Sequence, residues 1–237
     1  SIFAHKAADY LIGVNRRSVS LSRREIQPCL PGGNGGLPRR GEADMLSPGS
    51  DFNRLPMTDP ATTIVLITGA GGGFGSHMVR QFRAAGAKLL LTDVTDGALR
   101  EATDDAGDAL VASFAADLSV EEGIRAVADI CTALDVVPDI LVNNAGLGVA
   151  GRLDSVPRER WETLMQLNLL APMRLCDLFL PGMIERGSGH IVNMSSLAGW
   201  VGSHGLSSYC ASKFGLRGFG ESLAADLNGT GVHVTNV

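Results

Sequence analysis

The sequence predicts an α/β fold in three layers, with a doubly wound parallel sheet between two layers of helices. From residue 62 to the end of the chain, short apolar runs alternate with longer amphipathic segments. This alternation is typical of parallel sheets, because each helix carries the chain back to the start of the next strand. The chain has 237 residues, of which 45% are hydrophobic, and this is enough for the core of one such domain.

Six strands and five helices are expected along this stretch. The expected strands lie near residues 63–67, 88–93, 109–115, 139–142, 189–194 and 231–236. The expected helices lie near residues 73–85, 96–106, 119–134, 157–186 and 207–228. Ligands of such sheets bind beyond the carboxyl ends of the strands. The residues just after each strand are therefore the candidates for function.

A glycine-rich turn, TGAGGGFG at residues 68–75, joins the first expected strand to the first helix. Its glycines let the backbone approach a pyrophosphate, and the helix N-terminus offers unpaired N–H groups and a positive dipole end. The spacing is Thr-Gly-x-x-x-Gly-x-Gly with no Gly-Lys-Ser/Thr after it, so this is not a Walker-type loop. A flexible turn is the alternative, but the flanking strand and helix favour nucleotide binding through Gly69, Gly73, Phe74 and Gly75.

Asp93 ends the second expected strand, about twenty residues beyond the glycine turn. A carboxylate there accepts hydrogen bonds from the adenosine ribose and repels the extra phosphate of NADP. Because no Lys or Arg lies in the turn to offset this repulsion, Asp93 favours NAD over NADP. The alternative is an aspartate that only ends a strand and caps the next helix, and Asp96 competes for that capping role.

Tyr209 follows Ser196 by thirteen residues and opens a Tyr-x-x-x-Lys motif with Lys213. Residues four apart share one face of a helix. A free tyrosine titrates near ~10, and lowering its pKa to about 7 needs about 4 kcal/mol of extra phenolate stabilisation. A cation about 4 Å away supplies roughly that much at an effective dielectric constant of about 20. On its own, such a pair is more often an aromatic anchor beside a solvated lysine, so the neighbouring motifs decide its meaning.

Further motifs occur in order along the chain: Asp117-Leu118 after the third expected strand, NNAG at residues 143–146, and Asn168 in a long helical segment. With the glycine turn and the Ser, Tyr and Lys residues, they make residues 62–237 resemble the short-chain dehydrogenase/reductase family. The resemblance implies a Rossmann-like fold with six of the usual seven strands, and an NAD(P)-dependent oxidoreductase.

The resemblance assigns a role to each candidate catalytic residue. Tyr209 would be the general acid/base, and Lys213 would lower its pKa and hold the nicotinamide ribose. Ser196 would position the substrate oxygen, since the family's spacing to the tyrosine selects it over Ser195. Asn168 would join a proton relay through water.

The same resemblance adds cofactor contacts outside the glycine turn. Asp117 and Leu118 would lie near the adenine. The turn of Asn143, Asn144, Ala145 and Gly146 would pass beside the cofactor while stabilising the sheet, and Tyr209 and Lys213 would also contact the cofactor. Ordinary turn chemistry is the alternative for both motifs.

A proline inside the expected helix 157–186 supports Asn168 independently of the resemblance. Pro172 has no N–H, so it cannot donate to the carbonyl four residues back, which belongs to Asn168. That freed carbonyl could hold a water. The alternative is an ordinary polar residue beside a tolerated proline.

The leading hypothesis is hydride transfer between NAD(H) and a secondary alcohol or ketone, with Tyr209 as general acid/base. A sugar-nucleotide epimerase or dehydratase and a non-catalytic nucleotide-binding fragment or scaffold remain alternatives. The loops expected to choose the substrate are apolar, which favours an apolar alcohol or ketone. Their apolar residues are Leu147, Val149, Trp200, Val201 and Leu206.

Composition bounds the remaining possibilities. The formal net charge of −5 argues against nucleic acid as a partner. No apolar run reaches the ~18–20 residues of a membrane span. Cys29, Cys131, Cys176 and Cys210 show no close pairing, so reduced thiols in a cytoplasmic protein are expected, with no metal site.

The two ends of the chain differ from the expected domain. Residues 1–60 are rich in Gly, Pro, Ser and Arg, and we expect a disordered extension, in which the part before Met57 is translated upstream sequence without function. We expect residues 61–237 to be the catalytic domain without its C-terminal end, with an open sheet edge at the last strand. When complete, the protein is expected to form a homodimer or homotetramer.

Overall fold

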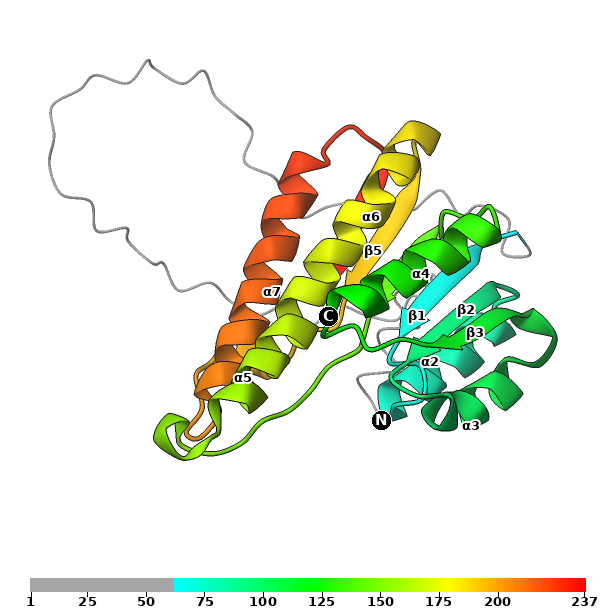
Figure 1. Cartoon of the computed structure of the whole chain (residues 1–237). Coiled ribbons are helices and arrows are strands. Elements are labelled where there is room, and N and C mark those ends of the chain that lie inside the picture. The colour runs from blue at the N-terminus through cyan, green and yellow to red at the C-terminus, as the bar shows by residue number, and fades with distance from the viewer. Residues whose placement is uncertain (1–61) are drawn as a thin grey trace, which may run out of the picture.

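The computed structural model describes residues 62–237, which form a parallel sheet of six strands in the order β3-β2-β1-β4-β5-β6 (Figure 1). The strands are β1 (Ile64–Thr68), β2 (Lys88–Asp93), β3 (Leu110–Ala115), β4 (Ile140–Asn143), β5 (Gly189–Asn193) and β6 (Val232–Asn236). The predicted doubly wound sheet is confirmed. Strand order reverses between β1 and β4, which is the switch point where ligands of such sheets bind.

Helices cover both faces of the sheet. They are α2 (Gly73–Ala84), α3 (Asp96–Ala106), α4 (Glu121–Ala133), α5 (Arg158–Met165), α6 (Ala171–Arg186) and α7 (Ser207–Asp226). One apolar cluster joins α2 and α3 to one face of the sheet, and a second joins α4, α6 and α7 to the other. In Figure 1, α4, α6 and α7 lie in front of the strands.

The burial of individual strand residues explains the unbroken apolar runs in the sequence. In β1, Val65 and Ile67 belong to the cluster under α2 and α3, whereas Leu66 between them belongs to the opposite cluster. All three are fully buried. A strand that packs on both faces has no solvent side, so it shows no polar alternation.

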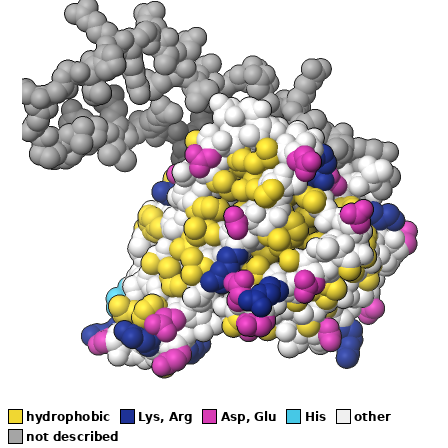
Figure 2. Space-filling view, turned by 45° about the horizontal axis from the view of Figure 1, so that its top comes forward, with side chains coloured by type: hydrophobic (Ala, Val, Ile, Leu, Met, Phe, Trp, Pro, Cys, Tyr) yellow, Lys and Arg dark blue, Asp and Glu magenta, His cyan; other side chains and the backbone are white. Residues whose placement is uncertain are grey.

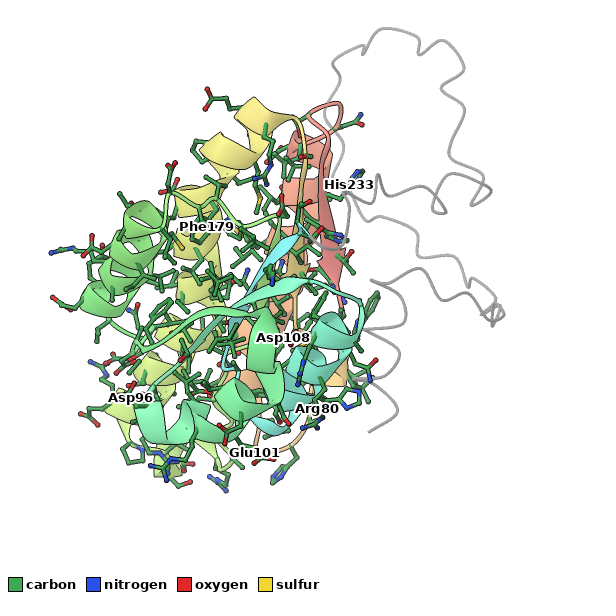
Figure 3. The ribbon with its side chains drawn as sticks, turned by 90° about the vertical axis from the view of Figure 1, so that its right-hand side faces the viewer. Arg80, Asp96, Glu101, Asp108, Phe179 and His233 are labelled. Atoms are coloured by element: carbon green, nitrogen blue, oxygen red, sulfur yellow. The ribbon has the colours of Figure 1, made fainter. Side chains whose placement is uncertain are left out.

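The outer surface of α2 and α3 is charged. Figure 3 shows Arg80, Asp96 and Glu101 on these two helices at the face turned toward the viewer. An ion pair of 2.6 Å joins Arg80 to Asp105 across the two helices. The amphipathic patterns from which these helices were predicted therefore correspond to a packed face and a solvated face.

The expected helix 157–186 is interrupted, which corrects the prediction of one continuous helix. A π-helical turn, η4 (Gln166–Leu170), separates α5 from α6, and the N–H of Ala171 donates to the carbonyl of Gln166. Pro172 lies in the first turn of α6. Because proline cannot make the regular hydrogen bond, the irregular turn falls just before it, around Asn168.

Arg158–Arg186, taken as one helix across this turn, is long and apolar enough to cross a membrane by length and composition. This qualifies the expectation that no segment could span. Buried core helices of soluble proteins meet the same criterion, so the finding is weak support for a span.

Smaller details also differ from the expectations. Thr95 caps α3 by accepting a hydrogen bond from Ala98, so neither Asp93 nor Asp96 is the cap. Short 3₁₀ turns at Gly107–Ala109, Leu153–Ser155 and Leu197–Gly199 were not predicted.

The expectations for residues 1–60, Cys29 among them, lie outside the described residues. Within residues 62–237, no group of three His, Cys, Asp or Glu side chains is placed to hold a metal ion.

Candidate active site

The glycine turn after β1 is bound to the NNAG turn after β4. The Asn144 side-chain amide donates to the carbonyls of Thr68 (2.8 Å) and Gly69 (2.9 Å). The Thr68 hydroxyl accepts from the backbone N–H groups of Asn144 and Ala145, both at 3.0 Å. Gly69 has a φ of +63°, and an added Cβ would lie 2.8 Å from Cα of Ala145. The two predicted motifs thus form one structural unit at the switch point.

The N-terminus of α2 is open to an anion. Its N-cap residue is Gly72, which has no side chain to accept hydrogen bonds from the first N–H groups of the helix. No acidic residue lies in the first turn. An added Cβ at Gly73 would meet nothing within 4 Å, and Phe74 is 46% exposed. At Gly75, by contrast, a Cβ would lie 2.1 Å from the carbonyl of Gly69. The turn therefore packs tightly inward and leaves its outer side free, as a pyrophosphate site requires.

Asp93 supports the glycine turn directly. Its Oδ2 accepts from the N–H of Gly71 at 2.9 Å, and its Oδ1 accepts from the N–H of Val94 at 2.7 Å. The carboxylate thus lies beside the turn, where the ribose contact was expected. Its role as a support for the loop was not predicted.

The Asp117-Leu118 pair lies after β3 and contributes mainly backbone to this region. Oδ1 of Asp117 accepts from both the N–H and the hydroxyl of Ser119. The Leu118 side chain is buried in the core cluster under α4 and α6, so only its backbone remains for an adenine contact.

Tyr209 and Lys213 lie one turn apart on α7, with Nζ of Lys213 5.9 Å from the centroid of the Tyr209 ring. Nζ donates to the carbonyl of Met194, just after β5, at 2.7 Å. Lys213 is only 5% exposed, and its burial lowers its pKa to about 8. The sequence thus predicted the pairing, whereas the anchor on Met194 and the deep burial come from the fold.

Asn168 is buried and holds the loop that follows the NNAG turn. Its Oδ1 accepts from the N–H of Leu147 at 2.7 Å, and its Nδ2 donates to the carbonyl of Leu147 at 2.9 Å and to Ser212 Oγ at 3.2 Å. An added Cβ on Gly146 would lie 3.4 Å from Asn168 Oδ1 and 3.8 Å from Lys213 Nζ. Three residues predicted from separate parts of the sequence therefore converge.

The two candidate serines have different surroundings. The Ser195 hydroxyl donates to the carbonyl of Lys213 at 3.3 Å, which commits it to the backbone of α7. The Ser196 hydroxyl accepts from the N–H of Ala198 at 3.1 Å, and its proton is left for another acceptor. This division favours Ser196 for the contact with a substrate oxygen.

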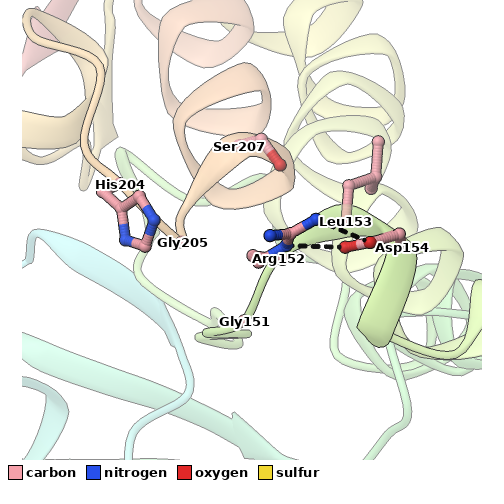
Figure 4. Close-up of a pocket in the computed structure, with 7 residues that line it drawn as sticks. All are labelled: Gly151, Arg152, Leu153, Asp154, His204, Gly205 and Ser207. Carbon is pink, nitrogen blue, oxygen red and sulfur yellow. Dashed lines mark hydrogen bonds and ion pairs between the residues drawn. The ribbon is translucent and has the colours of Figure 1, made fainter.

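A hollow of about 540 Å³ lies between the loop after β4 and the start of α7 (Figure 4). A hydrogen bond of 2.8 Å from Gly151 to Gly205 joins the two loops. The lining residues are Gly151, Arg152, Leu153, Asp154, His204, Gly205 and Ser207. An Arg152–Asp154 ion pair of 2.9 Å lies at its rim, and the Arg152 guanidinium holds the pKa of Asp154 below its ordinary value.

These charged lining residues were not among the predicted site residues. The sequence identified the two loops, but the substrate was predicted from their apolar residues. A loop sequence does not show which of its side chains face a hollow. Of those apolar residues, Val149 is buried, whereas Trp200 and Val201 are more than half exposed. Trp200 lies under the guanidinium of Arg217, 4.1 Å from it, on the flank of α7.

Comparison with known proteins finds dehydrogenases and oxidoreductases that match most of the described residues. The family model for short chain dehydrogenase matches residues 63–237. Epidermal retinol dehydrogenase 2 of Mus musculus is 40% identical over 175 residues, covering 71% of this chain and 55% of that protein. NADP-dependent 3-hydroxy acid dehydrogenase YdfG of Escherichia coli is 37% identical over 178 residues, covering 73% of this chain and 70% of that protein. The chain covers only 30% of "Probable oxidoreductase EphD" of Mycobacterium tuberculosis, to which it is 35% identical.

Solved structures of related oxidoreductases superpose on this fold. A metagenomic short-chain oxidoreductase in complex with NADP superposes with a TM-score of 0.71 at 36% identity, covering 76% of this chain and 81% of the other. Serine dehydrogenase from Escherichia coli superposes with a TM-score of 0.68 at 36% identity, covering 73% and 81%. With its sheet order, its glycine turn and its Tyr-x-x-x-Lys helix in place, the chain belongs to the short-chain dehydrogenase family.

Proposed function

We propose that the protein is a nicotinamide-dependent oxidoreductase that interconverts a secondary alcohol and a ketone. The observation that carries this proposal is the convergence of Gly146, Asn168 and Lys213, with Tyr209 one helical turn away. This group lies at the carboxyl ends of β4 and β5, next to the glycine turn. A buried cation beside a phenol is an arrangement for moving a proton, and a nicotinamide bound at the switch point would supply hydride transfer.

Each residue then has a defined task. Tyr209 gives its phenolic proton to the substrate oxygen in reduction and takes it back in oxidation. Lys213 holds a positive charge near the phenolate, and the burial that lowers its pKa to about 8 also strengthens this interaction. Ser196 donates a hydrogen bond to the same substrate oxygen. Asn168 fixes the loop at Leu147. In the irregular helical turn its own backbone carbonyl is free to accept a hydrogen bond from a water.

We further propose NAD as the preferred cofactor and an apolar secondary alcohol or ketone as the substrate. The Asp93 carboxylate beside the glycine turn supports the first, since it disfavours a phosphate on the adenosine ribose. The exposed Trp200 and Val201 support the second. The names of the relatives include both retinol and 3-hydroxy acids, and NADP in several cases, so both choices need direct measurement.

Association into a homodimer or homotetramer in the cytoplasm is also a proposal. The outer surfaces of α6 and α7 expose Met173, Ile184 and Phe214, each by about 40%. Figure 2 shows hydrophobic side chains gathered over much of the face in view, between acidic and basic side chains. Such a surface fits contact with a second copy.

The test of the main proposal is Tyr209→Phe, which removes the transferable proton and keeps the ring. With a panel of apolar ketones and 3-oxo acids, kcat should fall by about 10²–10⁴-fold, the usual contribution of a general acid or base. NADH binding, measured by fluorescence titration, should stay within about threefold, since the ring remains. A Tyr209→Phe variant with near-normal kcat would contradict the mechanism, and a wild-type protein without turnover on any substrate would favour the scaffold alternative.

A further inference from the structure

Three adjacent strands end in asparagine. Asn143 is the last residue of β4, Asn193 of β5 and Asn236 of β6, and their Cα atoms are in register across the sheet. Asparagine is depleted in strands, and most of the buried residues on both faces of this sheet are apolar. Asn193 is fully buried and Asn143 is 3% exposed. Packing alone therefore does not explain the choice of residue.

The three side chains form a ladder of hydrogen bonds that runs in one direction. Nδ2 of Asn143 donates to Oδ1 of Asn193 at 2.9 Å, and Nδ2 of Asn193 donates to Oδ1 of Asn236 at 3.2 Å. Buried amides are costly unless they are paired, and a connected row strengthens each bond by polarisation. The amide of Asn193 is paired on both sides, whereas Oδ1 of Asn143, at the start of the row, has no partner among the described residues. The row therefore makes a stiff link across the carboxyl edge of the sheet.

The ladder leaves the sheet and ends on α7. Nδ2 of Asn236 donates to the backbone carbonyl of Arg217 at 3.4 Å. Gly220 makes room for this contact, because an added Cβ there would lie 2.1 Å from Oδ1 and 2.7 Å from Nδ2 of Asn236. A glycine inside a helix lowers its intrinsic stability, so its presence at this contact indicates that the close approach matters.

The attachment point lies one helical turn beyond the reactive pair. Lys213 is four residues before Arg217 on the same face, and its Nζ donates to the carbonyl of Met194, the residue after Asn193. The carbonyl of Lys213 accepts from Ser195. α7 is thus attached to Met194 and Ser195 just after β5, and to Asn236 at the end of β6. These contacts set how deeply Lys213 and Tyr209 lie over the edge of the sheet.

We propose that Asn143, Asn193 and Asn236 are positioning residues that hold α7 at the depth required for Tyr209 and Lys213 to act. In this proposal the ladder acts through the backbone of α7, which it reaches at the carbonyl of Arg217. This inference rests on the proposed oxidoreductase activity, and its test separates the two.

The test uses the whole protein with Asn236→Ala, Gly220→Ala and the double variant. Asn236→Ala should lower kcat by about tenfold, since small displacements of reacting groups are costly, while KM for the alcohol changes less than about threefold. Gly220→Ala should lower kcat similarly by pushing against Asn236. In the double variant the pushed group is absent, so adding Gly220→Ala to Asn236→Ala should cost nothing more. Hydrogen exchange of the α7 amides should accelerate in both single variants.

Thr235→Val is the matched control. Thr235 precedes Asn236 on β6, and its hydroxyl lies 2.8 Å from Nε2 of His190. The substitution removes one hydrogen bond from the same strand and leaves the ladder intact. We therefore expect kcat to stay within about twofold and hydrogen exchange of the α7 amides to be unchanged. If wild type turns over and Asn236→Ala behaves like Thr235→Val, the inference is wrong. If the costs of Asn236→Ala and Gly220→Ala simply add, it is also wrong. Absence of wild-type turnover would instead contradict the proposed function.

Discussion

At the scale of single residues, Lys213 shows how function and stability oppose each other. Burial in the folded protein lowers its pKa from 10.5 to about 8. Below pH 8 the folded protein must keep a desolvated ammonium, which costs stability. As pH rises from 8 to 10.5 the folded state loses this proton before the unfolded state does, so the cost disappears.

This predicts a pH-dependent difference between wild type and Lys213→Met. The free energy of unfolding of wild type, relative to the variant, should rise by up to about 3 kcal/mol between pH 8 and 10.5. Other titrating groups cancel in the comparison because both proteins contain them. Urea unfolding at several pH values measures it, and a difference that stays constant over this window would show that Lys213 is not desolvated.

Asp93 leads to a prediction about cofactor choice. Wild type should bind NADH more tightly than NADPH. Substituting Asp93 itself would disturb its bonds to Gly71 and Val94, so the informative change is Val94→Arg, at a side chain that is 58% exposed. It should tighten NADPH binding by about five- to tenfold through an exposed charge pair, and leave NADH binding unchanged. Val94→Gln is the neutral control, and equal affinity of wild type for the two cofactors would refute the preference.

The residues that sequence could identify are those whose chemistry depends on fixed spacing. Tyr209, Lys213 and Gly69 belong to motifs that work only in one local geometry, so their pattern carries the information. Arg152 and His204 belong to loops, and what lies opposite them depends on how two segments about fifty residues apart approach each other. Met194 was missed for a related reason, because a backbone carbonyl leaves no mark in the sequence.

At the scale of elements, strand and helix positions were predictable because burial on both faces and amphipathic periodicity are strong local signals. The π-helical turn around Asn168 was not predicted. Pro172 showed where regular bonding fails, but the sequence alone does not tell whether the chain kinks or widens into a π turn.

This turn predicts different effects for two prolines of the same helix. Pro172→Ala restores a donor at the position that interrupts regular bonding, so it should favour α-helix through Asn168 and rotate that side chain away from Leu147. We expect kcat to fall by about tenfold, because Asn168 no longer holds the loop at Leu147. Pro181→Ala, in the middle of α6, is the control and should leave kcat unchanged. Equal kcat values for the two variants would show that the turn around Asn168 is not set by Pro172.

At the scale of the whole molecule, the polar functional groups gather where the strands end, while the strands themselves are apolar. The glycine turn follows β1, Asp93 ends β2, the NNAG turn follows β4, and Ser196 follows β5. Asn168 and the Tyr209–Lys213 pair come from helical segments farther along the chain, and both reach the same edge. A cofactor bound there would contact segments from both halves of the sheet, so its binding free energy should appear as stability of the whole fold.

Cofactor binding should therefore raise the melting temperature, and one glycine can test where it binds. NADH at about 100 times its Kd should add about 2.7 kcal/mol, or roughly 5–10 °C for a domain of this size. Gly73→Asp places a carboxylate in open space at the N-terminus of α2, where it should repel the pyrophosphate and abolish the shift. Gly218→Asp adds the same side chain in equally open space on α7 and should keep it. Tyr209→Phe should also keep it, because proton transfer is not needed for binding. A full shift in Gly73→Asp would place the cofactor away from the glycine turn.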